Sequence, residues 1–347
     1  MTRIGIIGMG FMGFTHFEGA RALDGAHVTA FSTRNPAKLA GDWTSIKGNF
    51  GPPGGKVDVS NLKACADYHD LLNDPDIDLI DICLPTDQHF KVVMESIAAG
   101  KPTLVEKPIS VSRDEAQQMV DAAESAGVPL LVAHVLPFFP EFEFAANAIA
   151  NQTYGALRAA HFRRVIAPPE WSDGMSDFTK LGGWGIDLHI HDNHFIAHAC
   201  GRPKKVFSSG ILQEGFVNHV HTNYIYENGP AVTAVSGGIA ASGLAFGHSF
   251  EMFFEDGTLL FDAGTYADEW VVSRPLSLVR NDRSVTPVEL PGDDSWCGAF
   301  TRELQTAVNH LQNGDGPGPL SAQVALDALN MCYAETESIQ QSAAIGL

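Results

Sequence analysis

The sequence lacks features that mark several common classes of protein. It carries 22 lysines and arginines against 41 aspartates and glutamates, which gives a formal net charge of −19. Nucleic acids and anionic membrane surfaces bind clustered positive side chains, so the composition argues against both as partners. The sequence also has no run of about 18 apolar residues, so we expect no transmembrane helix.

Cysteine pairs are missing as well. Five cysteines are scattered along the chain without a CxxC spacing, which predicts neither a disulfide framework nor a zinc knuckle. Small buried thiols are the simpler interpretation. The first apolar strand begins at residue 3 and leaves no room for a signal peptide, so a cytoplasmic location is expected.

Glycine, in contrast, is arranged in a pattern close to the N-terminus. An apolar strand leads straight into Gly8, Gly10 and Gly13, and a helical pattern follows. Gly8 allows a tight turn, Gly10 lets the backbone approach a pyrophosphate, and Gly13 lets the helix pack closely on the strand. The helix N-terminus, with the backbone N–H groups of Phe11 and Met12, offers a positive dipole end to phosphates. The pattern predicts a dinucleotide-binding unit.

The rest of the chain shows two different patterns of helices and strands. Strand and helix patterns alternate over residues 1–134, which predicts a Rossmann-type, doubly wound parallel sheet that binds NAD(P). Residues 48–56 interrupt this alternation as a glycine-rich insertion. Residues 135–347 begin with helices, continue from about 204 to 291 as short strands without helices between them, and end in two helices. We therefore predict an α/β fold whose second domain carries a large, open, mostly antiparallel sheet.

The end of the second strand bears on the choice of cofactor. NAD-binding units often place an acid about 20 residues after the glycines, where it bonds the adenine ribose. Here that region reads Ser32, Thr33 and Arg34, with no acid. Two hydroxyls beside an arginine suit a 2′-phosphate, so NADP is favoured and NAD stays possible. The alternative is that Arg34 only stacks on the adenine of either cofactor.

Three further motifs follow strand ends or open a helix. They are Leu84–Pro85–Thr86 with His89, then Glu106–Lys107–Pro108, then Asp187-x-x-x-His191 within a glycine-rich stretch. Together with the glycines, they resemble the glucose–fructose oxidoreductase/inositol dehydrogenase (Gfo/Idh/MocA) family over essentially the whole chain. The resemblance implies NAD(P)-dependent oxidation or reduction of sugars, cyclitols and related compounds. It also implies a homodimer or homotetramer formed through the C-terminal sheet, with the second domain binding the substrate.

The resemblance also implies roles for single residues. Lys107 and His191 would handle the hydroxyl proton during hydride transfer, a step that needs a general base. Asp187 would orient or bind the substrate. It lies four residues before His191, and an expected helix over 186–199 would place both on one face. Leu84, Pro85, Thr86, His89, Glu106 and Lys107 would lie on the cofactor side.

Some features depart from the family pattern or stay open. The family often has an aspartate where this chain has His194, and an arginine in the loop that here reads 135–140 without one. Trp171 is a candidate to stack on a sugar, or a core tryptophan. His191, His194 and His198 share a helical face, but hydride chemistry needs no metal and none is expected.

Two other functions are compatible with these motifs. One is an oxidative glycosidase that keeps its NAD bound through oxidation, elimination and re-reduction. The other is a dinucleotide-sensing regulator without turnover, against which the intact Lys107, Asp187 and His191 argue. The favoured hypothesis is a dehydrogenase that acts on a secondary hydroxyl or carbonyl of a sugar or polyol.

Overall fold

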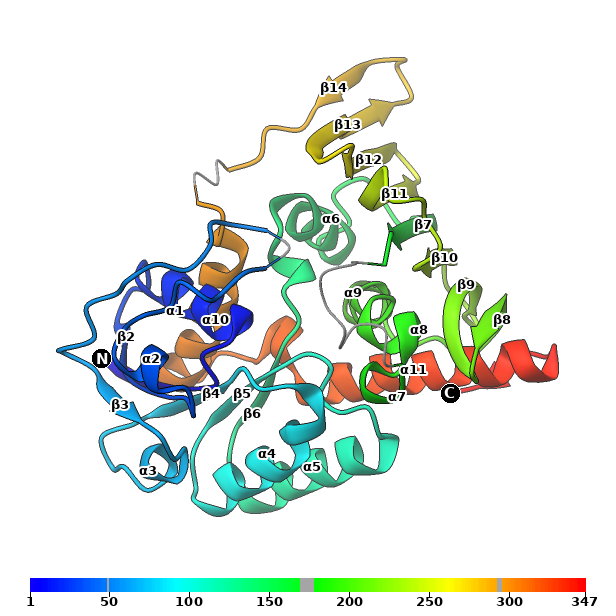
Figure 1. Ribbon diagram of the computed structural model, residues 1–347. Helices are drawn as coiled ribbons and strands as arrows, with labels where there is room; N and C mark the ends of the chain where they lie inside the picture. Colours follow the sequence, from blue (N-terminus) through cyan, green and yellow to red (C-terminus); the bar gives the residue numbers. More distant parts are fainter. Residues whose placement is uncertain (49, 169–177, 292–294) are drawn as a thin grey trace. The chain divides into compact units, whose positions relative to one another are not determined.

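The structure, a computed structural model, describes residues 1–48, 50–168, 178–291 and 295–347 (Figure 1). The chain forms two compact units, Met1–Phe138 with Gly292–Leu326 and Phe139–Pro291 with Asp327–Leu347. Within the first unit, Gln305 and Gln312 hydrogen bond to the backbone of Asp24 and Gly25, which ties the late segment to the early one. The predicted division of cofactor and substrate functions at residue 134 stays a prediction.

The first unit contains a parallel sheet of six strands in the order β3-β2-β1-β4-β5-β6. The order reverses between β1 and β4, and open α/β sheets bind ligands at such a switch point, beyond the carboxyl ends of the strands. The strands are β1 (Thr2–Ile7), β2 (Ala26–Ser32), β3 (Lys63–Cys65), β4 (Leu79–Ile82), β5 (Thr103–Glu106) and β6 (Leu130–Ala133). The predicted doubly wound sheet is confirmed.

Helices cover both faces of this sheet, so the central strands are buried on both sides and read as continuous apolar runs (Figure 1). The helices are α1 (Phe11–Ala20), α2 (Pro36–Leu39), α3 (His69–Leu72), α4 (His89–Ala98), α5 (Arg113–Ala126) and α10 (Gly298–Asn313). Short 3₁₀ turns are η1 (Thr86–Gln88), η2 (Leu136–Phe138) and η4 (Gly318–Leu320). The α1 helix ends at Ala20, and the backbone N–H of the next residue, Arg21, donates to the carbonyl of Glu18.

The insertion is anchored to the first unit by Trp43, whose side chain is fully buried. Its ring packs edge-on against Phe14 and Phe17 of α1 and Phe31 of β2. The indole N–H donates to the carbonyl of Lys38 at 2.9 Å. A core tryptophan five residues before the glycine-rich segment therefore holds the chain to the first unit at that point.

The second unit contains a nine-stranded sheet in the order β14-β13-β12-β11-β7-β10-β9-β8-β15. Its strand pairs are antiparallel except for β7 with β10, as the predicted mostly antiparallel sheet requires. The strands are β7 (Leu157–Ile166), β8 (Lys205–Gln213), β9 (Phe216–Ile225), β10 (Ala231–Gly237), β11 (Leu244–Phe254), β12 (Gly257–Tyr266), β13 (Glu269–Arg280), β14 (Val285–Pro287) and β15 (Ile345–Gly346). A tight hairpin at residues 255–256 joins β11 to β12.

Helices pack on one face of this sheet (Figure 1). They are α6 (Pro140–Ala150), α7 (Phe178–Leu181), α8 (Gly183–Asp187), α9 (Ile190–Cys200) and α11 (Ala322–Gln341). Phe142 of α6 meets Phe195 of α9 and Phe250 of β11 in edge-on ring contacts, and Phe195 meets Phe162 of β7. Among the described residues, no helix is long and apolar enough to cross a bilayer.

Candidate cofactor and active site

The glycine turn after β1 has the geometry that the sequence predicts. Gly8 adopts a φ of 100°, a region that favours glycine, and a Cβ there would lie 2.7 Å from the carbonyl oxygen of Cys83. A Cβ on Gly13 would lie 2.0 Å from the carbonyl oxygen of Gly8. A side chain is thus excluded at both positions by backbone atoms, because strand, turn and helix approach so closely.

Gly10 differs from these two positions, because a Cβ there would meet nothing within 4 Å. It is the N-cap of α1, no side chain caps the helix there, and the first turn carries no acid. The backbone N–H groups that begin α1, including those of Phe11 and Met12, therefore suit an anionic ligand. The open space over Gly10 and the uncapped helix fit the pyrophosphate of a dinucleotide.

The end of β2 lies beside this turn. The carbonyl of Ser32 accepts the N–H of Gly8 at 3.0 Å, and the Ser32 side chain is buried. Thr33 is half-buried and Arg34 is exposed. The Lys38 ammonium donates to the carbonyl of Met9 at 2.7 Å, and burial lowers the pKa of Lys38. Lys38 is a second cation at this edge that the sequence reasoning missed, because only the tertiary contact brings it to the glycine turn.

His89 joins the loops that follow β4 and β5. It is fully buried, with Nδ1 2.9 Å from the carbonyl oxygen of Pro108 and Nε2 2.9 Å from that of Leu84. Burial lowers the pKa of His89, so the ring is neutral and donates to one of the two carbonyls. The ring thus holds the two loops together, with Pro85 exposed and Thr86 half-buried on η1.

Glu106 is the last residue of β5, and Lys107 follows it. Glu106 is buried, and one of its oxygens lies 3.1 Å from Nε2 of His16 on α1. Its other oxygen accepts the backbone N–H of Lys107 at 3.0 Å. Lys107 itself is half-buried, directly beyond the carboxyl end of β5, and its peptide bond to Pro108 is cis.

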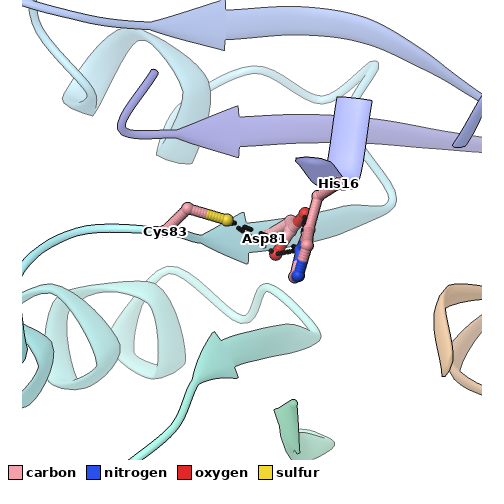
Figure 2. A group of neighbouring side chains, drawn as sticks. All are labelled: His16, Asp81 and Cys83. Atoms are coloured by element: carbon pink, nitrogen blue, oxygen red, sulfur yellow. Dashed lines mark hydrogen bonds and ion pairs between the residues drawn. The ribbon is translucent and has the colours of Figure 1, made fainter. Parts of the chain in front are cut away.

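The contact between Glu106 and His16 belongs to a buried polar cluster inside the first unit. His16 on α1, Asp81 on β4 and Cys83, the residue that follows β4, point toward one another (Figure 2). Nδ1 of His16 lies 2.9 Å from Asp81 and 3.5 Å from the Cys83 thiol. Glu303 of α10 lies 3.8 Å from Nε2 of His16. The sequence reasoning missed this cluster, since its members are far apart in the chain and form no spaced motif.

The second unit places Asp187 and His191 on two helices. Asp187 is the last residue of α8 and His191 lies in the first turn of α9. The helix predicted over 186–199 is therefore wrong at its start. Between the two helices the N–H of His189 reaches back five residues to the carbonyl of Trp184, which interrupts the regular i→i−4 pattern. The argument that four residues of spacing put both side chains on one helix face does not hold here.

Buried polar contacts fix the start of α9. The Arg164 guanidinium on β7 donates to both oxygens of Asp192, the neighbour of His191, at 3.0 and 3.1 Å. Asn193 donates to Glu335 of α11 at 2.9 Å, and Glu335 also accepts from the Tyr224 hydroxyl at 3.1 Å. These ties lock α9 to the sheet and to α11, and so they fix the backbone that carries His191.

Other predicted residues are placed less directly. Trp171 lies outside the described residues. The rings of His194 and His198 stack with centroids 6.4 Å apart, and burial lowers the pKa of His198. Among the described residues, the group whose donor atoms gather closely enough for one metal ion is a different one, His16, Asp81 and Cys83.

Comparison with known proteins agrees with this geometry. A family model described as an oxidoreductase family with an NAD-binding Rossmann fold matches residues 2–134. This match assigns the domain of residues 2–134 to the Gfo/Idh/MocA oxidoreductase family. The Gfo/Idh/MocA domain contains the glycine turn, the Leu84–Thr86 loop and Lys107. The resemblance inferred from the motifs is confirmed, and residues 2–134 form the NAD(P)-binding Rossmann domain of an oxidoreductase.

Individual relatives are more distant. A myo-inositol 2-dehydrogenase of Thermotoga maritima is 24% identical over 353 residues, which cover 99% of this chain and 98% of that protein. A trans-1,2-dihydrobenzene-1,2-diol dehydrogenase of Sus scrofa is 35% identical, but over 44% of this chain and 46% of that protein.

Solved structures resemble the whole chain. A myo-inositol dehydrogenase from Corynebacterium glutamicum has a TM-score of 0.78 at 19% identity, and covers 100% of this chain and 99% of its own. An NAD-binding oxidoreductase from Klebsiella pneumoniae has a TM-score of 0.79 at 20% identity, with 99% and 98% covered. At these identities the likeness establishes the fold.

Proposed function

We propose that the protein transfers a hydride between a nicotinamide dinucleotide and a secondary hydroxyl or carbonyl group of a sugar, cyclitol or sugar-like compound. The observation that carries this proposal is the position of Lys107. Lys107 follows β5 directly, at the carboxyl ends of the parallel strands. The glycine turn after β1, which offers its backbone to a pyrophosphate, lies at the same edge of the sheet. A half-buried amine at that edge suits proton transfer beside a bound nicotinamide.

Each residue has a defined task in this proposal. The bound nicotinamide supplies the hydride acceptor or donor at its ring carbon C4. Lys107 takes the hydroxyl proton as the alcohol is oxidised and returns it in the reverse direction. His191 is the second proton-transfer group, and Asp187 binds a substrate hydroxyl. The Arg164–Asp192 pair supports this assignment, because it fixes the first turn of α9 that carries His191.

The proposed preference for NADP rests on the edge of β2. Arg34 is exposed and Thr33 is half-buried beside it, and no carboxylate occupies the position that would repel a 2′-phosphate. A planar guanidinium pairs with a phosphate through two parallel hydrogen bonds. NAD has no 2′-phosphate, so it would lack the pair with the Arg34 guanidinium and bind more weakly than NADP.

The substrate class rests on the relatives as well as on the site. The Thermotoga protein is named for myo-inositol and the pig protein for a dihydrodiol, and both names describe vicinal hydroxyl groups on a six-membered ring. We infer that this chain accepts a ring or chain polyol of that kind. We further propose a homodimer or homotetramer that assembles through the large sheet, where Ile211 and Trp270 are exposed.

The proposal is tested by incubating the protein with NADP or NAD and a panel of cyclitols, aldoses and dihydrodiols, and following reduced nicotinamide by absorbance. Lys107→Ala and His191→Ala should each lower turnover by about 10²- to 10⁴-fold while dinucleotide affinity is retained. Lys107→Arg is the matched control, because it keeps the charge but cannot act as a base at neutral pH. Full activity in both alanine variants would refute the assigned roles.

A further inference from the structure

Beneath the carboxyl edge of the first sheet, one histidine is surrounded by acidic and thiol groups from three other elements. His16 on α1 faces Asp81 of β4, Cys83 just after β4, Glu106 of β5 and Glu303 of α10, all of them buried. Figure 2 shows the His16, Asp81 and Cys83 side chains directed toward one another. The proposed mechanism uses none of these side chains.

The two ring nitrogens of His16 meet two different carboxylates. Nδ1 lies 2.9 Å from Asp81 and Nε2 lies 3.1 Å from Glu106. A neutral imidazole has a single N–H and can satisfy one carboxylate, whereas an imidazolium donates to both. Burial alone would lower the pKa of His16, but attraction to Asp81 and Cys83 and the hydrogen bonds to both together outweigh it, so the pKa of His16 lies well above its ordinary value.

Glu303 completes the charge balance. Among the described residues its carboxyl oxygens have no hydrogen-bond partner, and the side chain is fully buried. Burial, together with repulsion from Glu106 and Asp81, raises the pKa of Glu303 well above its ordinary value. A neutral Glu303 leaves one imidazolium between two carboxylates.

Glu106 connects this cluster to Lys107. The oxygen of Glu106 that does not face His16 accepts the backbone N–H of Lys107 at 3.0 Å. Both oxygens of Glu106 therefore have partners, one on the helix whose first turn suits the pyrophosphate and one at the proposed proton-transfer residue. Removing the His16 contact leaves the Glu106 side chain free to turn and to release the backbone of Lys107.

We propose that His16 is a positioning residue for Lys107: held as an imidazolium between Asp81 and Glu106, it keeps Glu106 turned inward and so fixes the backbone that presents the lysine. This inference rests on the proposed function of Lys107. The donor atoms of His16, Asp81 and Cys83 also lie within 4.8 Å of one another, close enough for a metal ion. Nδ1 of His16 already hydrogen bonds to Asp81, and Nε2 lies at ion-pair distance from Glu106, so we assign a proton to each nitrogen and make metal binding an outcome of the test.

The first test is direct. Nitrogen NMR of the histidine-labelled protein should show both ring nitrogens of His16 protonated at pH 7.5, the pH chosen about one unit above the ordinary histidine pKa. The His16 signals are those missing from His16→Gln. A singly protonated ring at that pH, or stoichiometric metal found by elemental analysis of the purified protein, would overturn the proposal.

The second test follows the backbone. His16→Asn keeps an amide near the Nδ1 position and loses the donor to Glu106, whereas His16→Gln keeps a donor near Nε2. Amide exchange of Lys107 should rise about ten-fold in His16→Asn and less in His16→Gln, because one hydrogen bond contributes roughly that factor. Leu104, paired with Leu131 in the sheet, is the internal reference and should not change.

The outcomes separate this inference from the proposed function. Equal acceleration at Leu104 and Lys107 would show a general loss of stability and refute a positioning role. Neither measurement depends on turnover. A confirmed imidazolium and selective exchange at Lys107, together with full activity of Lys107→Ala, would keep the structural link and reject the proton-transfer role.

Discussion

A methyl group added at Gly10 or at Gly13 should separate cofactor binding from folding. At Gly13 the new Cβ would lie 2.0 Å from the carbonyl oxygen of Gly8, so backbone must move by more than about 1 Å to reach an ordinary contact. Such overpacking costs about 1–3 kcal/mol. For a unit of this size, that lowers the Tm by about 2 to 12 °C.

Gly10→Ala is the matched control for stability and the test for binding. Its Cβ meets nothing within 4 Å, so the Tm should stay near that of the wild type. The methyl group would instead occupy the approach to the pyrophosphate and remove a charge-assisted hydrogen bond of about 1.5–3 kcal/mol, a loss of roughly 10- to 100-fold in affinity.

The assays are thermal unfolding without cofactor and fluorescence titration with NADPH. Wild-type NADPH affinity in Gly10→Ala would refute the placement of the pyrophosphate over this turn. An unchanged Tm in Gly13→Ala would refute the close packing of α1 on β1.

Three other variants test separate parts of the structure. Arg34→Ala should weaken NADPH binding by about ten-fold in a calorimetric titration and leave NADH unchanged, because the guanidinium pairs with the 2′-phosphate alone; an equal loss for both cofactors would favour stacking on adenine. Glu303→Gln should become more stable relative to the wild type as pH rises. Above the ordinary pKa of 4.5 the unfolded wild-type chain releases the Glu303 proton, whereas the folded protein keeps it. The free energy of unfolding of the wild type therefore falls with pH until the raised pKa of folded Glu303 is passed, and that of Glu303→Gln does not. Parallel pH profiles in denaturant unfolding would contradict this. Arg164→Met should cost about 3–5 kcal/mol by leaving Asp192 buried without its partner, and adding Asp192→Leu should restore most of that loss in the same assay.

Much of the fold could be predicted because it depends on local patterns. The apolar runs of β4 and β5 and the glycine turn each occupy a few neighbouring residues, and a parallel sheet leaves such runs in the sequence. The N-cap of α5 is local in the same way: the Ser112 hydroxyl accepts the N–H of Glu115, three residues later, at 3.4 Å. The Glu115 carboxylate in turn accepts from the Ser110 hydroxyl at 2.7 Å.

What could not be predicted depends on contacts between distant residues. The break between α8 and α9 follows a single backbone bond from His189 to Trp184 in a stretch whose residues all tolerate a helix. The contact of Lys38 with Met9 and the cluster around His16 join positions that are 29 and 65 residues apart, respectively. No spacing rule covers such pairs, since tertiary packing alone brings them together.

The most direct test of the proposed reaction uses a polyol from the activity panel with deuterium on its carbinol carbon, turned over with NADP. The account predicts deuterium at C4 of the reduced nicotinamide, detected by mass spectrometry, and loss of this transfer in Lys107→Ala. With a glycoside as the substrate instead, release of the aglycone without net reduced cofactor would indicate an oxidative glycosidase. Tight dinucleotide binding with no transfer across the panel would indicate a sensor. Either result would contradict the proposed dehydrogenase.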